Sequence, residues 1–419
     1  MKKRDFLKNL LLAPAAFPTM AALKDFVDGH NYLSDDELAK DEIFWSQIRG
    51  GYRLKPDYIN LENGYYCMIP QYTLEKYIEH IRHVNYQASY YMRTVQVNNK
   101  RRMAAKLAKL VGAQEDEIVI TRNTTESLDM IIGGVHWQKG DEAVFAQQDY
   151  GAMQNMFRLQ EKKHGIINKI VSVPNHPKND EEIVDLYAAQ ITDKTRLLMV
   201  CHIINITGHI LPIRKICDMA HSKGVEVMVD GAHAVGHFEF KMSDLNCDYY
   251  GSSLHKWLSV PLGSGLLYVK SGKAKNIWPL LASGRYENHI HTLNHTGTHP
   301  AATDLAVVDA IDYHNMIGPS RKEARMRYIQ RYWSDQLRGE ENVVINTPED
   351  HHRSCGIANV GLTNIPPKEM AKRLIEDYNI WTVAIDGANV HGCRISPNVY
   401  TTTEELDVFV DAVKKLSKV

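Results

Sequence analysis

Residues 225–270 of the chain read VEVMVDGAHAVGHFEFKMSDLNCDYYGSSLHKWLSVPLGSGLLYVK. The apolar run at the start of this stretch ends in an acid, Asp230, and is typical of a buried strand in an α/β sheet. A second strand-like run, residues 247–253, is followed by a lysine, Lys256. Ligands of such sheets bind at the carboxyl ends of the strands, so we expect both side chains to lie at a site of chemistry.

Strand-like runs and helical patterns alternate through residues 118–230. This alternation predicts an α/β fold with a mainly parallel sheet that is covered by helices on both faces. After Lys270 the pattern changes to two long helical stretches, residues 302–318 and 321–337, followed by a mixture of short strands and helices. The sequence therefore predicts a large domain followed by a smaller α+β domain.

Four parts of the chain are predicted: a signal peptide over residues 1–23, an amino-terminal arm over 24–75 that contributes to the small domain, a large domain over 76–300, and a connecting helix with the small carboxyl-terminal domain over 301–419. Within the arm, residues 34–49 predict a short helix, because apolar residues recur at helical spacing behind an acidic first turn. The aromatic-rich residues 85–93 indicate no element.

Charge and cysteine content narrow the function. The 419 residues include 49 basic and 50 acidic side chains, so no strong field attracts nucleic acid or an anionic membrane. Small molecules and copies of the chain itself are the expected partners. Six scattered cysteines without a C-x-x-C spacing indicate buried free thiols rather than a disulfide framework or a zinc site.

The amino terminus carries an export pattern. A basic segment, residues 2–8, precedes an uncharged, moderately apolar stretch, residues 10–23. This stretch is too short to span a membrane well. The string KRDFLK resembles the twin-arginine pattern, with Lys3 in the place of the first arginine. We expect a periplasmic or exported protein. The alternative is an amphipathic helix that remains on a cytoplasmic protein.

Side chains suited to a planar, phosphorylated cofactor follow the other predicted strands. Hydroxyls at a helix amino terminus suit a phosphate, although simple helix capping explains them equally well. A tyrosine ring can stack on a planar ring, and an amide can donate to a ring oxygen. The candidates are Thr124, Thr125, Tyr150, Asn205, His233, Ser253 and His255. Together with an amine for a Schiff base and an acid for a pyridinium proton, they favour a pyridoxal phosphate site.

The chain resembles the class V aminotransferase family of fold-type I pyridoxal phosphate enzymes, which includes the cysteine desulfurases, and especially its isopenicillin N epimerase-like branch. The matching strings, in family order, are TRNTTESL (121–128), QDYGA (148–152), HIINITG (202–208), VDGAHAVG (229–236), SSLHKWL (252–258), TGT (296–298) and RISPNVYTT (394–402). The resemblance implies a seven-stranded type of sheet in the large domain and a homodimer with shared active sites.

The resemblance also implies a role for each candidate. Lys256 carries the cofactor as a Schiff base, Asp230 pairs with the pyridine nitrogen, and Tyr150 stacks on the ring. Asn205 and His233 contact the side of the ring hydroxyl. Thr124, Thr125, Ser253 and His255 hold the phosphate, with Thr298 reaching in from the second subunit. Arg394 holds the substrate carboxylate, as a planar bidentate fork can. We add Asn63 as a substrate contact and His233 as a catalytic group beside Lys256 and Asp230.

The reaction itself stays open at this point. Epimerisation, elimination and transamination share all of these residues, and each begins with loss of the α-proton of an amino acid. Residues 384–392 hold no cysteine of the kind that cysteine desulfurases carry on a flexible loop, which argues against persulfide chemistry. A carbon–sulfur lyase or an aminotransferase remains an alternative, as does a non-catalytic protein that keeps the fold.

Four histidines, His289, His291, His295 and His299, fall close together. Gly297 and Pro300 argue against a helix there, and no carboxylate or cysteine lies among them, so we predict no metal site. A loop that crosses to the second subunit is the better interpretation.

Overall fold

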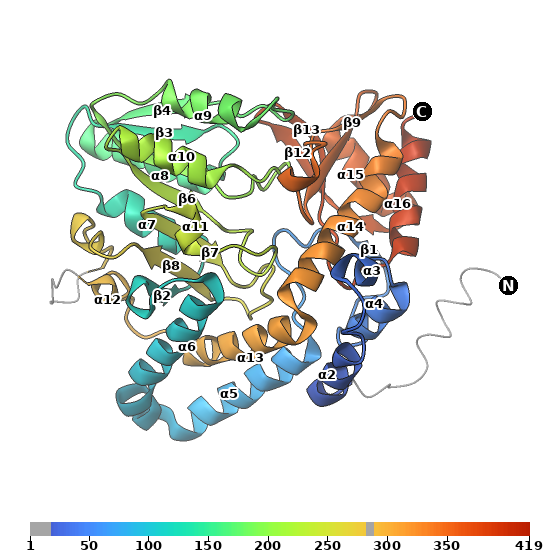
Figure 1. Cartoon of the computed structure of the whole chain (residues 1–419), viewed down its shortest axis with the longest axis horizontal. Coiled ribbons are helices and arrows are strands. Elements are labelled where there is room, and N and C mark those ends of the chain that lie inside the picture. Colours follow the sequence, from blue (N-terminus) through green and yellow to red (C-terminus); the bar gives the residue numbers. More distant parts are fainter. Residues whose placement is uncertain (1–17, 282–288) are drawn as a thin grey trace.

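A computed structural model describes residues 18–281 and 289–419, and Figure 1 shows its arrangement. Its centre is a seven-stranded sheet with the order β2-β8-β7-β6-β5-β3-β4. The strands are β2 (Ile118–Thr121), β3 (Glu142–Ala146), β4 (Ile167–Val171), β5 (Thr195–Cys201), β6 (Glu226–Asp230), β7 (Tyr249–Ser253) and β8 (Gly265–Val269). Only β8 runs against the others, so the mainly parallel sheet predicted from the sequence is confirmed.

Both faces of this sheet are buried. Val227 and Val229 of β6 belong to one apolar cluster, whereas Met228 between them belongs to the cluster on the other face. Side chains alternate between the faces of a strand, so a strand covered by helices on both sides must be apolar throughout. The surrounding helices are α7 (Thr124–Gly134), α8 (Gly151–His164), α9 (Asp180–Ala188), α10 (Ile213–Ser222) and α11 (Met242–Leu245).

A smaller domain lies beside the large sheet (Figure 1). Its four-stranded antiparallel sheet has the order β12-β13-β10-β9. Its elements are β9 (Val343–Ile345), β10 (Ala358–Leu362), α15 (Pro367–Tyr378), β11 (Ile380–Trp381), β12 (Val383–Gly387), β13 (Val390–Ile395) and α16 (Thr403–Leu416). Strand β1 (Ile59–Asn60) of the amino-terminal arm pairs in parallel with β11, so the arm lies against this domain.

Long helices lie below the sheet in Figure 1. They are α5 (Gln71–Tyr90), α6 (Gln96–Val111) and α13 (Ala301–Ile317), and α14 (Pro319–Leu337) continues from α13 into the small domain. Residues 85–93, which the sequence left without an element, are helical: α5 kinks at Ala88, where φ is 47°, and a π-helical turn over Tyr91–Val95 follows. Between residues 289 and 300, Ile290–Leu293 form the short helix α12.

The predicted helix over residues 34–49 is divided in two. Helix α3 (Asp35–Ala39) ends near Lys40, and α4 (Glu42–Arg49) begins after Asp41. The Asp41 carboxylate accepts hydrogen bonds from the N–H groups of Ile43 and Phe44, at 2.9 and 3.0 Å. An aspartate in that position is a strong helix start, and it competes with continuation of the preceding helix.

The arm begins with α2 (Met20–Asp28), which is capped by Thr19 and buries Leu23 and Val27. The predicted end of the signal peptide, residue 23, falls inside this helix. Most of the predicted signal lies outside the described residues, so export remains a prediction. Within residues 18–281 and 289–419, no helix is both long and apolar enough to cross a bilayer.

Candidate active site

The predicted site residues gather at one edge of the large sheet, because six of its seven strands point the same way. Thr124, Tyr150, Asn205, Asp230 and Ser253 follow or end β2, β3, β5, β6 and β7. Backbone bonds hold these ends in register, as when the N–H of His202 donates to the Asp230 carbonyl at 2.8 Å. The convergence expected from the sequence is therefore present.

Lys256 lies in a tight turn after β7 and contacts His233. Its Nζ is 2.9 Å from His233 Nε2, and Trp257 Nε1 donates to His233 Nδ1 at 3.2 Å. An indole N–H can only donate, so Nδ1 must be the unprotonated nitrogen of a neutral imidazole. The proton is then on Nε2, which donates to Lys256 and requires a lone pair on its amine. The geometry thus favours an uncharged Lys256.

The electrostatic surroundings act in the same direction. Burial lowers the pKa of Lys256 to about 8, with Arg394 adding to this effect and Asp230 opposing it. Burial also lowers the pKa of His233 well below its ordinary value, and the Lys256 charge adds to that shift. A lysine in these surroundings is a better nucleophile and base at neutral pH than an exposed lysine.

Asp230 ends β6 and is buried. Its Oδ1 accepts the N–H of Ala232 at 3.0 Å, and its other carboxylate oxygen accepts no hydrogen bond from the described residues. Burial raises the pKa of Asp230, while the N–H of Ala232 and the charge of Lys256 oppose the rise. A buried carboxylate with a free oxygen needs a cationic or N–H partner, which a protonated pyridine nitrogen provides.

The predicted phosphate contacts come from α7 and β7. Ser253 Oγ accepts the Thr124 N–H at 3.0 Å and lies 2.7 Å from Thr124 Oγ1. His255 is half-buried, and its Nδ1 is buried without a hydrogen-bond partner among the described residues. The amino terminus of α7, two hydroxyls and an unpartnered imidazole nitrogen fit a bound phosphate.

Arg394 on β13 is brought to the same region, where its guanidinium is already paired. Nε and Nη2 donate to the two carboxylate oxygens of Glu62, at 3.1 Å for Nε, and Nη1 donates to the Asn205 carbonyl at 3.3 Å. The Asn205 backbone therefore links the predicted carboxylate clamp to the predicted ring contact. Glu62 was not a candidate from the sequence.

The remaining candidates are placed less directly. Tyr150 immediately precedes α8 and is 48% exposed, Thr125 is half-buried on α7, and Thr298 is exposed. The Asn63 amide is committed within the protein: Nδ2 donates to the Ser396 carbonyl at 2.8 Å and Oδ1 accepts from Tyr400 at 2.7 Å. Asn63 holds the loop that carries Glu62. Its role as a substrate contact, like the stacking by Tyr150 and the crossing of Thr298, remains a prediction.

Two further polar residues beside the site were missed. Lys322 on α14 is buried and donates to the Trp257 carbonyl, and burial lowers its pKa to about 8. Asp149 follows β3, and burial raises its pKa to about 7, with the nearby Asp230 carboxylate adding to the rise. The position of Asp149 before Tyr150 at a strand end was a usable signal. Lys322 lies mid-helix among other charged residues and gave none.

No thiol is presented as an exposed nucleophile. All six cysteines are free and buried, as expected from their scattered positions. Burial raises the pKa of Cys67 and of Cys393 to about 12. Residues 384–392 form the tight β12–β13 hairpin, whose turn residues Ala388 and Asn389 both have positive φ. The two strands of this segment are joined by a two-residue turn rather than by a long loop.

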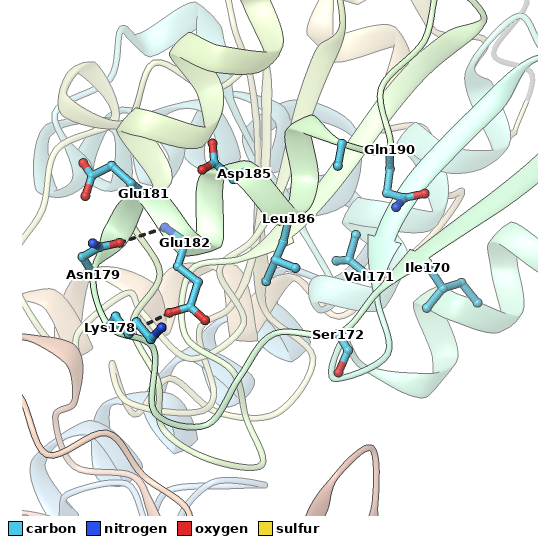
Figure 2. A pocket seen from close by; sticks show the side chains of 11 residues that line it. Ile170, Val171, Ser172, Lys178, Asn179, Glu181, Glu182, Asp185, Leu186 and Gln190 are labelled. Atoms are coloured by element: carbon cyan, nitrogen blue, oxygen red, sulfur yellow. Dashed lines mark hydrogen bonds between the residues drawn. The ribbon is translucent and has the colours of Figure 1, made fainter.

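A hollow of about 710 Å³ lies away from these groups, between β4 and α9 (Figure 2). Its lining includes Ile170, Lys178 and Glu182, and β4 is the outermost strand on that side of the sheet. It contains none of the candidate residues. Among the described residues there is also no group of three or more histidine, cysteine or acidic side chains placed to hold a metal ion.

Comparisons with known proteins agree with this geometry. The family model described as aminotransferase class-V matches residues 67–409. The chain is 26% identical to an isopenicillin N epimerase of Streptomyces clavuligerus, covering 89% of this chain and 98% of that protein. It is 27% identical to a probable cysteine desulfurase of Halobacterium salinarum, covering 75% of this chain and 80% of that protein.

Solved structures share the fold. The apo structure of a cysteine desulfurase from Thermococcus onnurineus has a TM-score of 0.78 at 20% identity, covering 89% of this chain and 98% of that chain. A C-DES variant with glycine covalently linked to its pyridoxal phosphate cofactor has a TM-score of 0.76 at 19% identity, covering 85% and 96%. The predicted fold-type I architecture is therefore confirmed.

The residues present fit pyridoxal phosphate. Lys256 supplies the amine, Asp230 has an oxygen free for the ring nitrogen, and the Thr124–Ser253 pair with His255 suits the phosphate. When bound, this cofactor draws electrons from the α-carbon of an attached amino acid and so makes its proton removable. With the family model matching most of its length and these residues in place, the chain belongs to the class V aminotransferase family of pyridoxal phosphate enzymes.

Proposed function

We propose that this enzyme removes the α-proton of an amino acid and that its reaction is an epimerisation or an elimination rather than a cysteine desulfuration. The observation that carries the proposal is the short β12–β13 hairpin at residues 384–392, which contains no cysteine and turns over only two residues. A desulfurase needs a reactive thiolate close to the substrate sulfur, and such thiolates lie in partly exposed, electropositive surroundings.

Lys256 is the proton acceptor in this proposal. Its amine is released from the cofactor when the amino group of the substrate takes its place. Burial and the contact with His233 then favour the uncharged form of that amine. Asp230 would keep the pyridine nitrogen of the cofactor protonated, and the positive charge of the ring favours loss of the α-proton. His233 orients the amine and can share its proton through Nε2.

The similarity to an isopenicillin N epimerase supports the epimerase form of the proposal. Purified protein is incubated in D₂O with a panel of L-amino acids and sulfur conjugates, and α-deuteration, the inverted enantiomer, pyruvate and keto acids are measured. We expect α-deuteration together with either the inverted enantiomer or pyruvate. A keto acid that retains the side chain of its substrate, as the main product, would replace the proposal with a transamination, whereas pyruvate from a β-substituted substrate indicates elimination.

Persulfide formation is tested in the same reactions with L-cysteine. A protein-bound persulfide in the wild type that is absent from Cys67→Ala or Cys393→Ala would overturn the proposal. Lys256→Ala should show none of the products, and it separates enzyme chemistry from reaction with free cofactor.

We also propose that two copies of the chain share their active sites and that the mature protein is exported. The first proposal is supported by exposed aromatic residues Tyr86 and Tyr90 on α5 and by the exposed Thr298. Sedimentation should give a dimer, and Thr298→Ala should loosen the cofactor. The second rests on residues 2–23, and an intact Met1 on protein recovered from cells would contradict it.

A further inference from the structure

Three of the five N–H groups of the Arg394 guanidinium are already used within the protein, including both on its Nε/Nη2 edge. Nε and Nη2 are used by the Glu62 carboxylate, and Nη1 is used by the Asn205 carbonyl. The side chains of Arg394 and Glu62 are only 8% and 7% exposed. A carboxylate from the same chain therefore takes up the bidentate position that the carboxylate of an amino acid would need.

Glu62 is held in this position by the backbone around it. Its Oε1 also accepts the N–H of Tyr65 at 3.0 Å. The flanking Leu61 and Asn63 are bonded to Ser396, which is two residues from Arg394 on the same chain segment. Gly64 lies so close that a Cβ there would be 2.8 Å from Arg394 Cζ. Neighbouring backbone therefore holds both Glu62 and Arg394 in position.

The pair lies close enough to the reaction centre to affect it. The charges of both Arg394 and Glu62 act on the Lys256 amine, and the Arg394 charge acts on His233. The chain segment that follows Glu62 also contacts the turn that carries Lys256, where the N–H of Cys67 donates to the His255 carbonyl at 3.3 Å. One guanidinium edge cannot hold two carboxylates at once, and separating a buried ion pair leaves a charge without a partner.

We propose that Glu62 determines the substrate specificity of this enzyme by competing with the substrate carboxylate for Arg394. While Arg394 and Glu62 are paired, the site binds a primary amine that has no carboxylate on its reacting carbon. An amino acid binds only when Glu62 has moved away. The proposal rests on the proposed amino-acid chemistry at Lys256 and adds the amine as a second class of ligand.

The test compares an amino acid with its decarboxylated counterpart. Dissociation constants of L-alanine and ethylamine are measured from the cofactor absorbance of the holoenzyme in the wild type and in Glu62→Gln. The isosteric amide removes the competing charge, so we expect L-alanine to bind about tenfold more tightly or better. Ethylamine should change less than about twofold, because it does not use Arg394. An equal change for both ligands, or no gain for L-alanine, overturns the proposal.

Propionate gives a measurement that needs no reaction at Lys256. Calorimetry on the holoenzyme should show tighter propionate binding in Glu62→Gln and in Glu62→Ala than in the wild type. Arg394→Gln combined with Glu62→Gln should lose this gain. An absent gain in both single variants overturns the proposal even if the enzyme turns over amino acids, whereas a missing α-proton exchange in the wild type would count against the proposed function alone.

Glu405→Gln is the matched control. Glu405 makes a bidentate pair with Arg49, at 2.8 Å for both bonds, and the two side chains are 24% and 29% exposed. This variant makes the same chemical change in an ion pair of similar geometry outside the site. It should leave the affinities for L-alanine, ethylamine and propionate unchanged, and a gain there equal to that of Glu62→Gln overturns the proposal.

Discussion

Lys256 Nζ lies 2.9 Å from His233 Nε2, and the imidazole can donate but not accept at that nitrogen because Trp257 fixes its tautomer. The amine is thus paired with a donor, which disfavours its ammonium form. The lowered pKa of Lys256, about 8, agrees with this arrangement.

The first prediction concerns the pH dependence of cofactor attachment. An amine must lose its proton before it attacks an aldehyde, and with a pKa of about 8 roughly a tenth of Lys256 is uncharged at pH 7. The rate at which cofactor-free enzyme captures pyridoxal phosphate should rise tenfold per pH unit below 8 and level off above it. Stopped-flow absorbance measures this rate. A continued rise to pH 10 would contradict the lowered pKa.

The second prediction concerns Trp257. Trp257→Phe removes the donor to His233 Nδ1, so the imidazole can move its proton there and accept from a charged Lys256. We expect the midpoint of the capture profile to move to higher pH by up to about one unit. An unchanged midpoint, in a variant shown by circular dichroism to be folded, would mean that burial alone sets the pKa of Lys256.

The third prediction separates the two lysines of the site, Lys256 and Lys322. Lys256→Ala should lose the absorbance band of the attached cofactor and the label fixed by borohydride. Lys322→Met should keep the absorbance band and the label, because the amine of Lys322 donates to the Trp257 carbonyl and does not hold the cofactor. Both lysines have a pKa near 8, so reactivity by pKa alone would label both. Loss of the band in Lys322→Met but not in Lys256→Ala would reverse the assignment.

The fourth prediction is a stability change with pH. The folded pKa of Asp149, about 7, lies above its ordinary value of 3.8, so between these values the folded state holds a proton that the unfolded state has released. Stability from this group is therefore full below about pH 4 and falls by up to about 1.4 kcal/mol per pH unit until pH 7. Asp149→Asn mimics the protonated form, so its gain in melting temperature over the wild type should be larger at pH 8 than at pH 5.

The fifth prediction concerns the turn after Asp230. A Cβ on Gly231 would lie 2.0 Å from Tyr250 Cζ, whereas a Cβ on Gly151, at the start of α8, would meet no atom within 4 Å. Gly231→Ala should lower the free energy of unfolding by about 3 kcal/mol. Gly151→Ala should raise it by up to about 1 kcal/mol. Urea denaturation of the two variants measures the difference, and equal values would contradict the packing at Gly231.

The strands, and the positions of Asp230 and Lys256 after them, could be predicted because their sequence signals are local. The apolar run before Asp230 reports burial on both faces, and the string around Lys256 resembles a known family. The orientation of β8 could not be read, since a short apolar strand has the same pattern in a parallel or an antiparallel pair. The division of residues 34–49 could have been read from Asp41, because aspartate favours the start of a helix. The prediction gave more weight to the helical spacing of the apolar residues.

The partner of Arg394 could not be predicted from the sequence. Glu62 lies 332 positions away, and an acid in a strand-to-turn segment is ordinarily exposed to solvent. The tautomer of His233 was equally hidden, because Trp257 is adjacent to Lys256 in the chain but reaches His233 only through the turn that follows β7. Both relationships depend on tertiary geometry that no spacing rule describes.

The parallel pairing of β1 with β11 sets an order of events during synthesis. Ile59 emerges from the ribosome long before its partner Ile380, so the arm has no strand to join until most of the chain has been made. Glu62 lies two residues after β1, and Arg394 comes later still than Ile380. The large sheet can form first, while the part of the site that discriminates between ligands is assembled last, when the carboxyl-terminal domain closes on the arm.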